Sequence, residues 1–110
     1  MPYDEALAAR VRDELIGELS VTERKMFGGL GFMVDGNMAV AASSGGDLMV
    51  RADPDGSQEW IDGESVRPME MRSRPMTGWL LVSVDALEDD EELATWVARG
   101  VAYARSLPAK

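Results

Sequence analysis

Residues 26–32, MFGGLGF, followed by residues 35–38, DGNM, decide the fold of this 110-residue chain. Three glycines lie among large apolar residues in the first stretch, and the second stretch forms a turn signal. Leu30, Phe32 and Val34 alternate with smaller or polar neighbours, which is the period-two pattern of a half-buried strand. Aspartate followed by glycine, as at positions 35 and 36, readily takes the positive dihedrals of a type I′ turn. The segment therefore predicts a β-hairpin whose second strand covers residues 37–42.

The hairpin is expected to belong to a larger antiparallel sheet. Residues 43–46, SSGG, mark another turn, and residues 48–52 supply a third strand, which completes a meander. Residues 24–28 are expected to extend the first strand, bent or bulged at the glycines. Residues 65–71 are predicted as a fourth strand. Residues 78–84 are predicted as a fifth strand that is apolar on both faces and therefore lies centrally.

Helices are predicted at both ends of the chain and once in the middle. The first covers about residues 4–19, with an apolar stripe formed by Leu7, Ala8, Val11, Leu15, Ile16 and Leu19. A short helix is expected after Asp53, which would cap it; it contains Trp60 and ends near Gly63. The last covers about residues 89–106, with a stripe formed by Leu93, Trp96, Val97, Gly100, Val101 and Ala104. With residues 72–77 as a loop, the order is α-β3-α-β2-α, a single α+β domain over residues 1–110 with helices packed on the sheet.

The composition excludes several kinds of catalytic and metal site. The chain contains no cysteine and no histidine, which excludes disulfides, thiolate nucleophiles, Cys/His zinc sites and Ser-His-Asp triads. Its net charge of −9 opposes binding to nucleic acid or anionic lipid and favours either solubility or a basic partner. No apolar run approaches the roughly 20 residues of a membrane helix, and the acidic N-terminus does not resemble a signal peptide. We therefore expect a noncatalytic cytoplasmic protein with no metal and no cofactor, which neither binds nucleic acid directly nor enters a membrane.

The candidate partner- or ligand-binding residues fall in two groups. They are Lys25, Met26, Phe27, Gly28 and Gly29 in the glycine-rich strand, and Arg51, Arg74, Met76 and Trp79 in later strands and loops. The glycines either expose backbone to a partner or allow close packing of strands. The methionines either form an adaptable binding surface or fill the core. A dinucleotide loop is excluded, because Val34 stands where a third glycine is required and a strand follows.

Two charged clusters each have two interpretations. Arg67, Arg72 and Arg74 either form a basic patch for phosphate or an acidic partner, or pair with the many carboxylates of the chain. The acids within residues 85–92 either bind a hard cation such as Ca²⁺ or begin the last helix in solvent. The second interpretation is favoured in both cases, because the chain is acidic and the acidic run lacks the spacing of an EF-hand loop. Arg51, which follows an apolar strand, is expected to form a salt bridge at the strand end.

Four motifs occur in an order that links the chain to a known family. They are the glycine segment 26–32, the turn 35–38, the strand LMVR at 48–51 and the segment RPMTGW at 74–79. Together they resemble the N-terminal domain of the TfoX/Sxy competence-regulator family over nearly the whole chain. The resemblance implies an α-β3-α-β2-α fold similar to secretion-chaperone and YjbR-like domains, and it supplies no catalytic residues. Full-length members carry a second, C-terminal helical domain, and they promote natural transformation by assisting a cyclic-AMP receptor protein at competence genes.

We therefore expect a noncatalytic regulatory or protein-interaction module in bacterial competence and transcription regulation. The alternative is a small-molecule-binding protein, or a carboxylate-based enzyme, with a pocket near the glycine-rich strand and the 74–79 loop. A third hypothesis, a chaperone-like homodimer, follows from analogy of fold alone.

Overall fold

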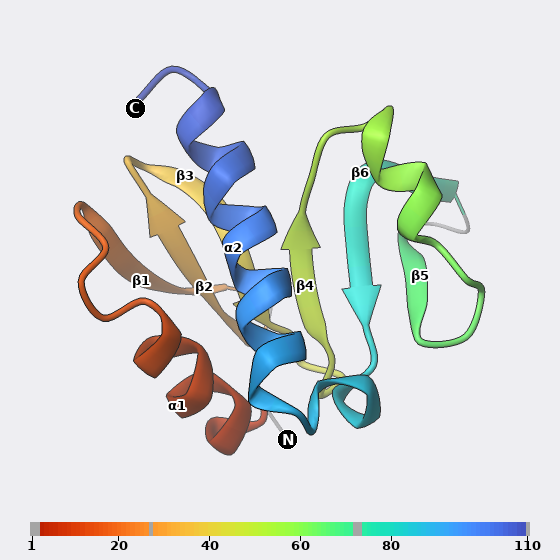
Figure 1. The fold of residues 1–110 in the computed structure, drawn as a ribbon, viewed down its shortest axis with the longest axis horizontal. Helices are drawn as coiled ribbons and strands as arrows, with labels where there is room; N and C mark the ends of the chain where they lie inside the picture. The colour runs from red at the N-terminus through yellow and green to blue at the C-terminus, as the bar shows by residue number, and fades with distance from the viewer. Residues whose placement is uncertain (1–2, 27, 72–73, 110) are drawn as a thin grey trace.

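The computed structural model describes residues 3–26, 28–71 and 74–109 and confirms the α+β class. An antiparallel six-stranded sheet has the order β1-β2-β3-β4-β6-β5, and two helices pack on one of its faces (Figure 1). The strands are β1 Val21–Met26, β2 Gly29–Val34, β3 Asn37–Ala42, β4 Leu48–Arg51, β5 Val66–Met71 and β6 Arg74–Val82. The helices are α1 Glu5–Glu14 and α2 Asp90–Ser106, with short 3₁₀ helices η1 Gly56–Trp60 and η2 Val84–Leu87.

The predicted hairpin is confirmed. Asp35 and Gly36 have φ angles of 54° and 84°, the pair of positive values that a type I′ turn requires. From this turn β2 pairs with β3, and the register shifts after Phe32, which faces Val40. Ala39 is thereby the extra residue of a β-bulge, a feature that bends the strand.

The prediction that residues 24–28 extend the first strand is wrong. Residues 21–26 form β1, which reverses at Gly28 and pairs along the whole of β2, from Val21 opposite Val34 to Met26 opposite Gly29. As an edge strand, β1 has exposed side chains at four consecutive positions, 22–25. It therefore lacks the apolar alternation that marks a half-buried strand. The meander has four strands where three were expected.

The second half of the sheet also differs in detail. The expected loop over residues 72–77 is wrong in its later part, because β6 begins at Arg74 and pairs with β5 from there. Pro75 lies inside β6 opposite Glu70, and proline within a run argues against a strand when the sequence is read alone. The internal position of residues 78–82 is confirmed, since β6 lies between β4 and β5.

Helix α1 is shorter than predicted. Asp4 caps its start by accepting hydrogen bonds from the amides of Ala6 and Leu7. The helix ends at Glu14, and the chain turns through Gly17, whose φ is +95°. The predicted stripe is therefore wrong at two of its members, because Ile16 is 79% exposed and Leu19 is 77% exposed.

Helix α2 matches its prediction closely. All six residues of the expected stripe are buried, and Asp89 caps the first turn by accepting a hydrogen bond from the amide of Glu91. The middle helix is a 3₁₀ helix that contains Trp60 as expected, but it ends at Trp60 and not near Gly63. The predicted Asp53 cap is wrong, because the helix begins after Asp55 and has no side-chain cap; the Asp53 carboxylate accepts from the amide of Asp55 instead. No described helix has the length and apolarity needed to cross a membrane.

The core lies between the helices and the sheet. It contains Leu7, Val11, Phe32, Val40, Leu48, Val50, Leu80, Val82, Leu93 and Val97, each at most 3% exposed. Full burial of such a side chain stabilises the fold by about 1.5–3 kcal/mol. Helix α2 approaches the sheet closely at Gly100, where an added Cβ would lie 2.5 Å from the Ala39 carbonyl oxygen. The fold thus places α2 firmly on β3 and leaves its other faces to neighbours or solvent.

Candidate functional site

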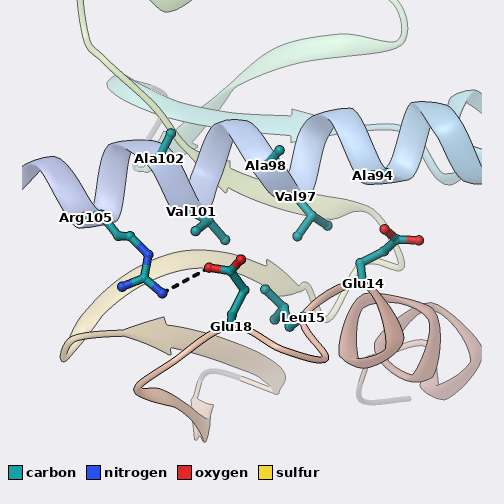
Figure 2. A pocket seen from close by; sticks show the side chains of 9 residues that line it. All are labelled: Glu14, Leu15, Glu18, Ala94, Val97, Ala98, Val101, Ala102 and Arg105. Atoms are coloured by element: carbon teal, nitrogen blue, oxygen red, sulfur yellow. Dashed lines mark hydrogen bonds and ion pairs between the residues drawn. The ribbon is translucent and has the colours of Figure 1, made fainter.

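A groove of about 510 Å³ lies between the C-terminal end of α1 and the length of α2. One wall is the last turn of α1 with the turn that follows it, and the other wall is α2 (Figure 2). In Figure 2, Val97 and Val101 lie on the side of α2 that faces Leu15 and Glu18. The residues that line the groove are Glu14, Leu15, Glu18, Ala94, Val97, Ala98, Val101, Ala102 and Arg105.

The floor of the groove is apolar and the side chains at its mouth are small. Leu15, Val97 and Val101 are buried, whereas Ala98 and Ala102 are exposed on α2. The chain turn at Gly17 that follows α1 also turns Ile16 and Leu19 toward solvent, next to groove residues 15 and 18. Among the described residues these two are the exposed large hydrophobic side chains. The turn therefore combines an apolar groove with apolar side chains that no core covers.

Charge at the groove is mostly negative. Glu14 and Glu18 belong to the wall formed by the end of α1. Arg105 lies at the other end, where it pairs with Glu18 at 3.0 Å and with Asp35 at 3.3 Å. It also donates to the Leu19 carbonyl oxygen at 3.0 Å. Two carboxylates thus hold Arg105 at one end of the groove, and Glu14 is exposed at the rim.

Two of the predicted site residues, Arg51 and Trp79, contact each other, and this contact joins elements of the fold. They face each other in the register of β4 and β6, and the Arg51 guanidinium lies 5.0 Å from the Trp79 ring centre. The same guanidinium lies 5.7 Å from the ring centre of Tyr103 on α2. Such cation–π contacts contribute about 0.5–2 kcal/mol. Arg51 therefore joins two strands to α2, where the sequence led us to expect a strand-end salt bridge.

The glycines of the predicted site allow close packing. A Cβ on Gly29 would lie 2.7 Å from the Ala42 carbonyl oxygen, and one on Gly28 would lie 3.1 Å from the Ser44 Cβ. This supports the packing interpretation over backbone exposure to a ligand. Lys25 is exposed on the edge strand β1, while the Met26 side chain and Phe27 lie outside the described parts of the structure.

The remaining predicted residues are not gathered with the others. Arg74 is exposed at the start of β6, and Met76 is half-buried opposite Met69. Met69 and Gly29 line one small cavity of about 120 Å³, together with Ala41, Ala42, Ser43, Ser44 and Met49. A small-molecule site usually needs roughly 300–1,000 Å³. The predicted set therefore divides between a packed glycine turn, an Arg51–Trp79 stack and the start of β6.

Part of each charged cluster follows the interpretation favoured from the sequence. Arg67 pairs with Asp47, and the acids at positions 90–92 occupy the first turn of α2. Within residues 3–26, 28–71 and 74–109, no three acidic side chains are grouped to hold a metal ion. Arg72 lies outside these ranges.

Two carboxyl groups with clearly shifted pKa values lie outside the groove. A hydrogen bond from Arg12 lowers the pKa of Glu23, and the two side chains form a bidentate pair at 2.7 and 2.9 Å between α1 and β1. Backbone amides of Val66 and Glu64 lower the pKa of Asp62 in the loop before β5. Both shifts have structural causes, so neither marks an acid–base site.

Sequence reasoning missed the groove because it assigned Ile16 and Leu19 to the core. A signal was present in Gly17, which interrupts the predicted helix. Glycine inside a helix costs about 1 kcal/mol relative to alanine, and it permits the positive φ of the turn that follows α1. Residues after such a glycine need not remain on the stripe, and here they do not.

Comparison with models of known protein families gives a match over residues 13–104 to the family described as the TfoX N-terminal domain. The matched region begins within α1, contains the whole sheet and ends within α2, so it includes every residue that lines the groove except Arg105. No match is found among curated proteins.

Proposed function

Because the chain belongs to the TfoX N-terminal domain family, we propose that it is a noncatalytic regulatory module that acts through contact with a protein partner. The observation that carries the proposal is the pair of exposed side chains Ile16 and Leu19 beside the groove between α1 and α2. Exposed apolar surface that adjoins an apolar groove and is rimmed by polar residues is typical of protein-interaction sites. The absence of histidine and cysteine supports a noncatalytic role.

The energetic scale of such a contact is sufficient for specificity. Complete burial of Ile16 and Leu19 by a partner would contribute about 3–6 kcal/mol before the cost of association. Since about 1.4 kcal/mol corresponds to a tenfold change in affinity, these two residues are enough to separate a specific contact from a weak one.

The family resemblance supports a role in the transcription of competence genes, in the cytoplasm, through a protein and without direct DNA binding. A net charge of −9 supports the same view, because the phosphate backbone repels an acidic protein. The module would then influence transcription by holding another protein.

A photo-crosslinking amino acid placed at position 98, in the groove, tests the proposal in the native host. Position 9, an exposed alanine of α1 that does not line the groove, is the matched control. We expect a crosslinked protein at position 98 that is absent at position 9. The crosslink should disappear when Ile16→Ser and Leu19→Ser are introduced together, with the fold checked by circular dichroism. Equal crosslinking at both positions, or a crosslink indifferent to the double substitution, would refute the proposed contact surface.

A further inference from the structure

The groove between α1 and α2 has the length and the surface to receive a helix. Its α2 wall runs from Ala94 to Arg105, which is about 16 Å at 1.5 Å per residue. Val97 and Val101 point toward the α1 wall, while Ala98 and Ala102 are exposed and project from the other side of α2 (Figure 2). Three turns of an incoming helix cover the same length.

The charges at the groove specify the kind of helix. Glu14 and Glu18 flank the apolar floor, and Glu91 is exposed one helical turn before Ala94 on α2. Arg105 offers little repulsion to a cation, because Glu18 and Asp35 already pair with it. An occupant that complements this surface carries an apolar stripe with lysine or arginine at its edges.

Two other occupants fit less well. A second copy of this chain would bring a net charge of −9 against the same charge, and carboxylates against carboxylates. An extended peptide would need a free sheet edge, and both edges are protected. Edge strand β1 exposes Glu23, Arg24 and Lys25, while β5 carries Pro68 and a register shift.

We infer that the groove binds a basic amphipathic α-helix of another protein, with the helix's apolar stripe on Val97 and Val101 and its cationic edge against Glu14. Ile16 and Leu19, exposed next in sequence to the groove residues Leu15 and Glu18, supply further apolar surface for the partner. This inference rests on the proposed function, since it names the class of partner for the same surface. Charge complementarity of this kind accelerates association and makes it sensitive to salt.

A synthetic amphipathic peptide of about 18 residues, with leucines at helical spacing and lysines along both edges, tests the inference. Two further peptides serve as controls: one has the same composition in an order without an apolar face, and the other has glutamate in place of lysine. Fluorescence anisotropy should show about tenfold or tighter binding of the first peptide than of either control, a 1.4 kcal/mol difference. Amide chemical shifts should change at Ala94, Ala98 and Ala102.

Substitutions locate the binding. Ala98→Glu and Glu14→Lys should each weaken the lysine peptide about tenfold or more, whereas their matched controls should bind as the unmodified protein does. The controls are Ala9→Glu and Glu92→Lys, which make the same changes at exposed helical positions outside the groove. The inference would be overturned if the peptide without an apolar face bound equally well, or if the control variants lost as much affinity. Either result would mean nonspecific attraction. A dimer in sedimentation that Ala98→Glu dissociates would overturn it as well, in favour of a second copy.

The crosslinking experiment separates this inference from the proposed function. Suppose position 98 captures a protein whose linked segment, mapped by mass spectrometry, is acidic or not helical. The inference then fails while the proposed function stands. If the lysine peptide binds in the groove but position 98 captures nothing in the host, the proposed function fails.

Discussion

Replacement of Gly100 by alanine should destabilise the protein, although alanine is the better helix former. Intrinsic propensity favours alanine by about 0.8–1.0 kcal/mol inside a helix. Against this, the new Cβ would lie 2.5 Å from the Ala39 carbonyl oxygen and 2.7 Å from the Val40 Cγ1. Ordinary contacts between nonbonded carbon atoms are about 3.5–4.0 Å. The methyl group therefore cannot be accommodated unless α2 moves away from β3.

The size of the effect follows from these opposed terms. Overpacking of a core typically costs about 1–3 kcal/mol, and the upper end applies here because the nearest atom is backbone and not the end of a flexible side chain. After subtraction of the propensity gain, the free energy of unfolding should fall by about 2 kcal/mol. For a domain near 100 residues, this corresponds to a decrease in Tm of about 8 °C or more.

Urea and thermal unfolding followed by circular dichroism measure the change. Ala98→Gly, at an exposed position of the same helix, is the control for propensity and should cost about 1 kcal/mol. A Gly100→Ala protein as stable as the unmodified one, or more stable, would show that α2 does not press on β3 as described. The contact between helix and bulged strand would then have to be looser than the structure has it.

Three other changes test single interactions. Glu23→Gln should flatten the acid side of the stability curve: Arg12 lowers the folded pKa of Glu23, so this pair stabilises the fold above the ordinary glutamate pKa of about 4.3. That contribution is lost as pH falls through the lowered folded value. Ser57→Ala should raise the free energy of unfolding in urea by about 1 kcal/mol. Its Oγ is buried without a hydrogen-bond partner among the described residues. Arg99→Ala should lower the free energy of unfolding by about 1 kcal/mol and change the near-ultraviolet circular dichroism, because the guanidinium lies 4.3 Å from the ring centre of Trp60.

Local signals in the sequence predicted those elements that local chemistry determines. The type I′ turn at Asp35 and Gly36 needs two positive φ angles, and an aspartate–glycine pair supplies them in almost any context. The buried face of α2 was predicted residue by residue, because its 3.6-residue periodicity continues over 17 residues between clear ends. In both cases the information lies within a few residues of the feature.

Elements that depend on distant neighbours were predicted poorly. Within the sheet β1 pairs with β2 alone, and its exposed charged residues carry no apolar pattern to detect. The start of β6 contains Pro75, and a proline argues against a strand when the sequence is read alone. Pairing with β5 nevertheless makes this segment a strand. Arg51 and Trp79 were predicted to be neighbours in a binding site. Only the register of β4 and β6 shows that the guanidinium stacks on the ring.

The groove could not be predicted from the sequence for a related reason. Had α1 continued as predicted, the i, i+4 spacing would have kept Leu19 on the same face as Leu15, which packs in the core. The turn at Gly17 ends that relation after Leu15, so one apolar pattern serves two purposes: its first part is buried and its last part is exposed. Helix α2 is divided in the same way, since Gly100 presses on β3 while Ala98, which lines the groove, is exposed. The contact surface therefore exists because α1 ends early beside a helix that continues, a relation between two segments about 80 residues apart that periodicity within either one cannot reveal.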